Sequence, residues 1–186
     1  MSLAGIRVLE LAAVGTGEGR PSTSSGIAVA WAAKLFGDLG ADVIRVESAD
    51  GDDRVRSRPH ELHRWLTTNK RSIRYRPGDA IDALVTDADL VVHDGSWPEL
   101  DPELAIAAWP RLVVLAVTPF GQTGPYRDYA AEELSVIHGS SWGFLSPSAA
   151  TDIALPPLKA AGHHATINVA TAAAAAAFLF FLLRFS

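Results

Sequence analysis

Three glycines in the segment 15–19 are the first residues whose spacing suggests chemistry. They follow an apolar stretch, as glycines that cradle a dinucleotide do, and Glu47 closes a second apolar stretch, where an acid could hold a ribose. A dinucleotide loop needs G-x-G-x-x-G opening directly into a helix, so that amide groups and helix dipole meet the pyrophosphate. Here the third glycine comes one residue early, and Arg20-Pro21 intervenes. The spacing favours a flexible insertion, and an NAD(P)-dependent oxidoreductase is kept as a remote alternative.

A basic segment between Arg54 and Arg76 is the second feature with chemical potential. It carries eight basic residues against the single acid Glu61, a charge of +7 in a chain whose net charge is −5. Guanidinium groups match phosphate oxygens, so the segment could bind a phosphate-bearing ligand; the alternative is a solvated loop whose arginines pair with acids elsewhere. Only Trp65 and Tyr75 are aromatic, which argues against nucleic acid as a partner.

The histidines and serines do not form a recognisable catalytic or metal set. Neighbouring residues such as His163 and His164 point in different directions from one helix, and His60 and His63 lack a third ligand. Serines 22, 24 and 25 lack the G-x-S-x-G turn of a hydrolase. We therefore predict neither a metal site nor a serine triad.

Alternating apolar runs and helical patterns must position these residues. Branched apolar runs predict strands at 6–11, 42–47, 71–75, 90–92 and 112–117, and the intervening spacing predicts helices at 27–39, 79–86 (with Asp79 as N-cap), 102–108, 130–137 and 166–183. Strands apolar on both faces suit a parallel sheet covered by helices. The predicted fold class is α/β, a Rossmann-like, doubly wound and mostly parallel sheet.

Composition bounds the class of protein. The chain has 186 residues, 48% of them hydrophobic, which suits one domain with its own core, and it contains no cysteine for disulfides, zinc ribbons or thiol nucleophiles. The first eleven residues lack the layout of a signal peptide, so we expect a cytoplasmic location. Residues 164–183 carry no formal charge, but they are rich in alanine, so we expect a buried helix and no membrane association.

Four phrases in order resemble the class III CoA-transferase family, which includes formyl-CoA transferase, carnitine CoA-transferase and alpha-methylacyl-CoA racemase. They are L-G-A-D-V-I-R-V-E at 39–47, N-K-R-S-I at 69–73, P-R-L-V at 110–113 and T-P-F-G-Q-T-G-P-Y at 118–126. The resemblance implies transfer of CoA between carboxylic acids, with an acyl-CoA thioester and a carboxylic acid as partners and no tightly bound cofactor. It also implies an interlocked homodimer or pairing with another CoA-transferase-like domain.

The same resemblance implies positions for ligand contacts. Residues after the V-I-[KR]-V-E strand and around N-K-R-S-I line the CoA nucleotide in the family, and the loop after the first strand faces the pantetheine and thioester. Carried over to this chain, the CoA-binding residues are Val14, Gly15, Glu47, Ser48, Arg54, Asn69, Lys70 and Arg71. The turn 119–125 would shape the acyl site.

Departures from the family pattern concern the catalytic group. Family transferases use an aspartate in an A-D-[YF]-x-A-G phrase, whereas the corresponding phrase here, 165–170, places Thr166 at the nucleophile position. A threonine cannot form the acyl anhydride, so we assign no catalytic residue, and a catalytically inactive partner domain is the alternative to an active transferase. For the racemase branch, His138 is only a loose match to the family's histidine. The E-N-[FY]-x-P-G turn that contacts CoA in the family reads H-D-G-S-W at 93–97, where Asp94 would sit badly beside phosphate.

The last segment, 178–186, is apolar and has no helix stop. Family members are about twice as long, so we expect residues 1–186 to form one incomplete domain, the N-terminal part of a longer subunit.

Overall fold

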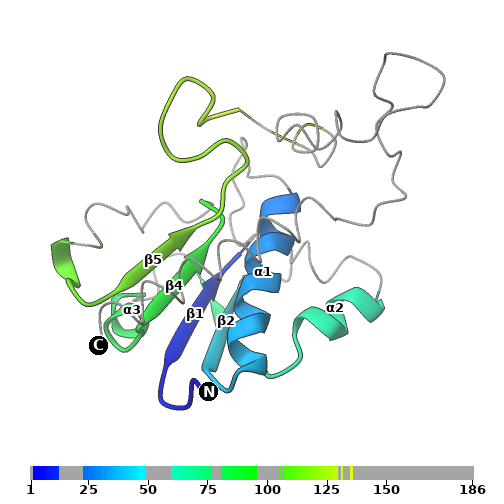
Figure 1. Ribbon diagram of the computed structural model, residues 1–186, viewed down its shortest axis with the longest axis vertical. Coiled ribbons are helices and arrows are strands. Elements are labelled where there is room, and N and C mark those ends of the chain that lie inside the picture. Colours follow the sequence, from blue (N-terminus) through cyan, green and yellow to red (C-terminus); the bar gives the residue numbers. More distant parts are fainter. Residues whose placement is uncertain are drawn as a thin grey trace.

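A parallel sheet flanked by helices forms the core of the chain in the computed structural model (Figure 1). The structure describes residues 2–12, 23–48, 60–76, 81–95, 105, 107–129, 131 and 135. Within them the elements follow in the order β1 (Arg7–Leu11), α1 (Thr23–Asp38), β2 (Asp42–Ser48), α2 (His60–Leu66), β3 (Lys70–Tyr75), α3 (Asp82–Thr86), β4 (Leu90–His93) and β5 (Val113–Ala116).

The sheet has the strand order β3-β2-β1-β4-β5, and every neighbouring pair is parallel. The chain winds outward from β1 to β3 and then returns to the other side of β1 to add β4 and β5. The order therefore reverses between β1 and β4, and in such sheets ligands bind at the carboxyl ends of the strands beside that reversal. The predicted doubly wound α/β fold is confirmed.

Two hydrophobic cores cover the two faces of the sheet because successive strand residues point to opposite sides. On one face, Val8 and Val92 pack with α1, including Phe36. On the other face, Leu9 and Val91 pack in a core that includes Val85 of α3. Cover on both faces of the sheet explains why β4 and β5 consist of nearly continuous apolar runs and lack alternation.

The connection from α1 to β2 depends on close backbone approaches. Gly40 has a φ of +96°, a left-handed conformation that favours glycine, and it ends α1. A Cβ at Gly37 would lie 3.1 Å from the carbonyl oxygen of Asn69, so the small residue lets the turn before β3 pack against α1. Asn69 is itself left-handed, with a φ of 62°.

Two details differ from the sequence prediction. The helix expected over 79–86 with Asp79 as N-cap begins at Asp82, its N-cap is Ile81, and no side chain caps it; Asp79 lies outside the described residues. The sequence analysis also missed α2, since basic residues mask its apolar positions; the buried Leu66 packs there against Ile27 and Ala30 of α1. The helices expected over 130–137 and 166–183 lie almost wholly outside the described residues.

Candidate functional site

The carboxyl ends of β1 and β4, beside the reversal of strand order, form the first half of the candidate site. The backbone N–H of Asp94 donates to the carbonyl of Leu11 at 3.3 Å, which joins the two strand ends. The N–H of Val117 donates to the carbonyl of His93 at 2.8 Å and adds the end of β5. His93 and Asp94 are both buried, although each has a polar side chain. Polar groups retained at this edge are candidates for ligand recognition.

His93 is held as a neutral imidazole. Its Nδ1 accepts a hydrogen bond from the N–H of Gly95 at 3.2 Å, so the ring proton is assigned to Nε2. Burial lowers the pKa of His93 from 6.5 to about 4, because the imidazolium would lose its hydration. Within the described part of the chain, neither Nε2 nor Oγ1 of the buried Thr118 hydroxyl makes a hydrogen bond.

The sequence analysis missed the environment of His93. It named the H-D-G-S-W turn as a departure from the family pattern but judged Asp94 and not the histidine. The signal was available: His93 directly extends the buried run Leu90–Val92, and a polar residue in such a run is an exception that needs a partner.

A row of charged side chains on the α1 face of β1, β2 and β3 forms the second half. Glu10 lies opposite Arg45 in the register of β1 and β2, and Arg45 lies opposite Ser72 of β3. Lys70 precedes Ser72 by two residues and Glu47 follows Arg45 by two, so all four charged side chains belong to one face of the sheet. All four are nearly fully buried.

Hydrogen bonds of Lys70 and longer ion pairs of Arg45 connect this charged row; Oε1 of Glu10 and Nε and Nη1 of Arg45 make no hydrogen bond among the described residues. Nζ of Lys70 lies 2.5 Å from Oε2 of Glu10 and donates to the carbonyl oxygen of Ala30, in α1, at 2.6 Å. Nε of Arg45 lies 3.5 Å from Oε1 of Glu10, and its Nη1 lies 3.9 Å from Oε1 of Glu47. Burial lowers the pKa of Lys70, and the neighbouring Glu10 carboxylate counteracts part of that effect.

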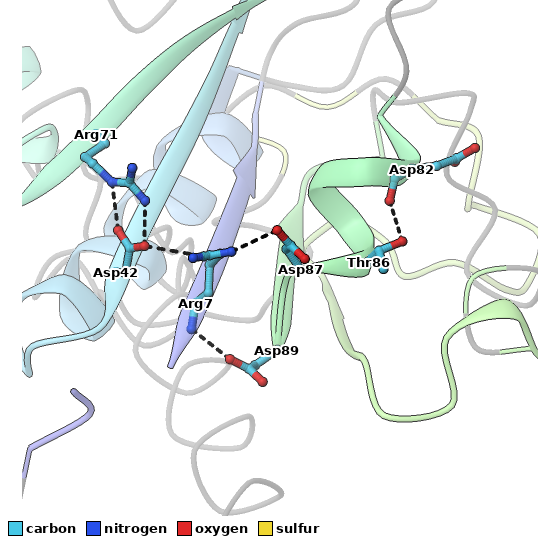
Figure 2. Close-up of polar contacts among 7 residues, drawn as sticks. All are labelled: Arg7, Asp42, Arg71, Asp82, Thr86, Asp87 and Asp89. Atoms are coloured by element: carbon cyan, nitrogen blue, oxygen red, sulfur yellow. Dashed lines mark hydrogen bonds and ion pairs between the residues drawn. The ribbon is translucent and has the colours of Figure 1, made fainter. Parts of the chain in front are cut away.

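The other two residues of the N-K-R-S-I phrase make contacts of their own. Nδ2 of Asn69 donates to Oδ1 of Asp38 at 3.0 Å. Arg71 binds both carboxylate oxygens of Asp42, at 2.8 and 2.5 Å, and Figure 2 shows Arg7 on the same carboxylate. The hydrogen bond from Arg71 is the main reason why the pKa of Asp42 is lowered. Asp42 and Arg71 lie at the amino ends of β2 and β3. This edge of the sheet is opposite the carboxyl ends where His93 and Asp94 lie.

The basic side chains of the segment 54–76 thus differ in where they lie. Lys70 is directed inward, to Glu10, and Arg71 contacts the first residue of β2. Arg64, Arg71 and Arg74 are exposed, whereas the Lys70 side chain is buried. Trp65 of α2 packs against Trp31 with ring centroids 4.2 Å apart, so part of this segment is anchored to α1 and is no solvated loop.

The turn 118–129 carries an aromatic cluster. Tyr126 and Tyr129 meet edge to face with centroids 5.3 Å apart, and Phe120 lies 6.4 Å from each. Both tyrosines are more than half exposed. Gly121 and Gly124 have positive φ angles, which explains the glycines of the P-F-G-x-x-G-P phrase.

Several residues that the sequence analysis considered lie outside the described residues: Val14, Gly15, Arg54, His138, His163, His164 and Thr166, together with the side chains of Ser48 and His60. The predicted CoA contacts, and the absence of the nucleophile, therefore stay predictions.

A shallow hollow of about 460 Å³ lies at the amino edge, lined by residues that precede β4 and β5, among them Asp87, Asp89, Trp109 and Arg111. Figure 2 shows that Arg7 contacts both Asp87 and Asp89, so these two carboxylates already have partners within the fold. The part of the chain that the structure describes contains no cluster of three potential metal ligands. None of its helices is long and apolar enough to cross a bilayer.

The sequence model of CoA-transferase family III matches residues 3–183. The chain belongs to CoA-transferase family III. Among family proteins, it is 33% identical over 167 residues to the succinate–glutarate CoA-transferase of Agrobacterium fabrum, an alignment covering 77% of this chain and 38% of that protein. It is 34% identical over 146 residues to the succinyl-CoA–L-malate CoA-transferase beta subunit of Chloroflexus aurantiacus, covering 69% of this chain and 33% of that subunit.

A solved structure shares the CoA-transferase family III fold. The CAIB/BAIF family protein from Brucella suis superposes with a TM-score of 0.74 at 28% identity and covers 98% of this chain and 49% of that one. The chain thus spans between a third and a half of the length of these three relatives. The resemblance noted from the four sequence phrases is confirmed.

Proposed function

We propose that this chain is part of an enzyme that acts on acyl-CoA thioesters and moves CoA between carboxylic acids. The family match over residues 3–183 carries the proposal. The names of the aligned relatives support it, since they are transferases of succinate–glutarate and succinyl-CoA–L-malate. In its favour, the polar ends of β2 and β4 lie at the edge where this fold class binds ligands.

The proposed CoA site uses the carboxyl edge of the sheet. Val14 and Gly15 follow β1 in the sequence, Glu47 and Ser48 end β2, and Arg54 comes six residues after the end of β2. Asn69 directly precedes β3, Lys70 and Arg71 begin it, and the side chains of all three make internal contacts. We therefore propose that the first group contacts the acyl-CoA molecule directly and that the second group supports the site from within the fold.

The proposed chemistry is nucleophilic and needs a carboxylate. The carboxylate oxygen attacks the thioester carbonyl and expels the CoA thiolate, which leaves a mixed anhydride. The thiolate then attacks the enzyme's own acyl carbon, releases the first acid and forms an enzyme–CoA thioester that the second acid resolves by the reverse steps. Because Thr166 stands at the expected position of that carboxylate, we propose that it comes from outside residues 1–186.

A catalytically inactive partner domain is the second candidate. Its support is that two of the aligned relatives are named as the alpha and the beta subunit of one transferase. Such a domain would keep a CoA or dimer surface while another copy of the fold supplies the aspartate.

Binding and trapping experiments test both candidates. Calorimetric titration with CoA is expected to show binding, and NAD is the matched control; binding of NAD in place of CoA would support the oxidoreductase alternative and overturn the proposal. Borohydride added during incubation with succinyl-CoA would reduce an enzyme–CoA thioester to a primary alcohol with release of CoA, and mass spectrometry would map the modified residue. Trapping on a residue within 1–186 would refute the view that this segment lacks the nucleophile. CoA binding without trapping, with trapping gained in Thr166→Asp, would identify the inactive partner domain.

A further inference from the structure

Four buried charges of alternating sign form a continuous row across the sheet. The row leads from Lys70 on β3 to Glu10 on β1 by a hydrogen bond, and from Glu10 to Arg45 and Glu47 on β2 by ion pairs of 3.5 and 3.9 Å. It therefore runs from the amino end of β3 to the carboxyl end of β2. Lys70 also bonds to the carbonyl oxygen of Ala30, which ties the row to the middle of α1.

Exposure along the row changes at one end. The side chains of Glu10, Lys70 and Arg45 are 0%, 1% and 2% exposed, and that of Glu47 is 9% exposed. Glu47 is thus the most exposed member of the row, although it too is largely buried. Burying four charges has a large desolvation cost, and apolar side chains of similar volume often stabilise a fold as well. A fold that keeps these buried charges despite the desolvation cost is consistent with a functional need for the carboxylate of Glu47.

We propose that Lys70 is a positioning residue: through Glu10 and Arg45 it holds the carboxylate of Glu47 at the carboxyl edge to accept a hydrogen bond from an N–H or O–H group of the CoA thioester. The inference rests on the proposed function. An isolated carboxylate there would repel the phosphates of CoA. The two cations of the row balance its two carboxylates. Glu47 therefore offers a hydrogen-bond acceptor within a row that has no net charge.

A double-mutant cycle tests the coupling by calorimetric titration of the chain with CoA. Lys70→Met is expected to raise the Kd for CoA about tenfold in the wild-type background and less than about twofold in Glu47→Gln, because nothing remains to be positioned. Glu10→Gln breaks the same row at its centre while keeping its shape, and it should reproduce the effect if Lys70→Met fails to fold. Arg7→Met is the control, because Arg7 pairs with acids at the opposite edge.

The ligand group is distinguished by repeating the titration with pantetheine, which lacks the nucleotide. Loss of affinity for both ligands assigns the contact to a pantetheine amide, and loss for CoA alone assigns it to the ribose hydroxyls. Equal losses from Lys70→Met in both protein backgrounds would overturn the inference.

A ligand-free measurement separates this inference from the proposed function. The ¹³C shift of the Glu47 carboxyl is expected to move in Lys70→Met and Glu10→Gln and to stay in place in Arg7→Met. An unmoved shift refutes the positioning role, whatever CoA does. Absence of CoA binding by the unaltered chain refutes the proposed function, while the shift still decides whether Lys70 and Glu47 are coupled.

Discussion

The buried, neutral His93 makes the stability of this fold depend on pH. Its pKa is about 4 in the folded chain against 6.5 when unfolded, because burial removes the water that would solvate the imidazolium. Between those two values the unfolded chain binds more protons than the folded chain. The stability is therefore fully present above pH 6.5 and is lost as the pH falls toward 4.

The size of this effect follows from the shift. One pKa unit corresponds to about 1.4 kcal/mol, so protonation of His93 alone lowers the free energy of unfolding by about 2 kcal/mol at pH 5 relative to pH 8, and by about 3 kcal/mol below pH 4. Other groups add their own dependence, so a variant that removes only this imidazole is needed to isolate it. His93→Asn serves, since its Oδ1 can still accept the hydrogen bond from the N–H of Gly95.

Urea unfolding of both proteins at pH 8 and pH 5 measures the effect. The loss of unfolding free energy between the two pH values is expected to be about 2 kcal/mol smaller in His93→Asn than in the unaltered chain. Equal losses in both proteins would refute the reasoning. An NMR titration of the ring gives a direct control, and a pKa for His93 near 6.5 would show that the imidazole is accessible to water.

Three further substitutions test the packing, the turn and the surface charges by urea unfolding. Phe36→Ala removes a side chain that is 2% exposed and should cost about 3–5 kcal/mol, whereas Leu39→Ala, at 48% exposed, should cost less than about 1; similar costs would contradict the assigned core. Gly40→Ala should cost about 1–2 kcal/mol because of its φ of +96°, and an unchanged stability would exclude that conformation. Arg71→Met breaks the exposed pair with Asp42 and should cost less than about 1 kcal/mol, with a difference that shrinks in 1 M salt; a larger, salt-independent loss would show that the pair is buried.

The alternation of strands and helices was predictable because its signal is local. Runs such as Leu90–Val92 are apolar on both faces, which indicates a covered parallel sheet before any contact is known. The family phrases were equally visible, and their glycines and prolines mark turns whose geometry the structure reproduces at Gly121 and Gly124. The start of α3 was less predictable, since Ile81 caps it without a side-chain hydrogen bond.

By itself, the sequence determined the fold class and the family, because both depend on the order of apolar runs and short phrases along the chain. Only the tertiary structure decided where the charged side chains lie and which partners they contact. Lys70 and Glu10 are sixty residues apart, and nothing local distinguishes a lysine that faces phosphate from one that lies inside the sheet. The pairing of β3 with β2, and of β2 with β1, brings them onto one face beneath α1. A positive segment that looks like a ligand-binding surface in the sequence thus partly stabilises the interior of the fold. The role of a charged side chain depends on the groups that pack around it.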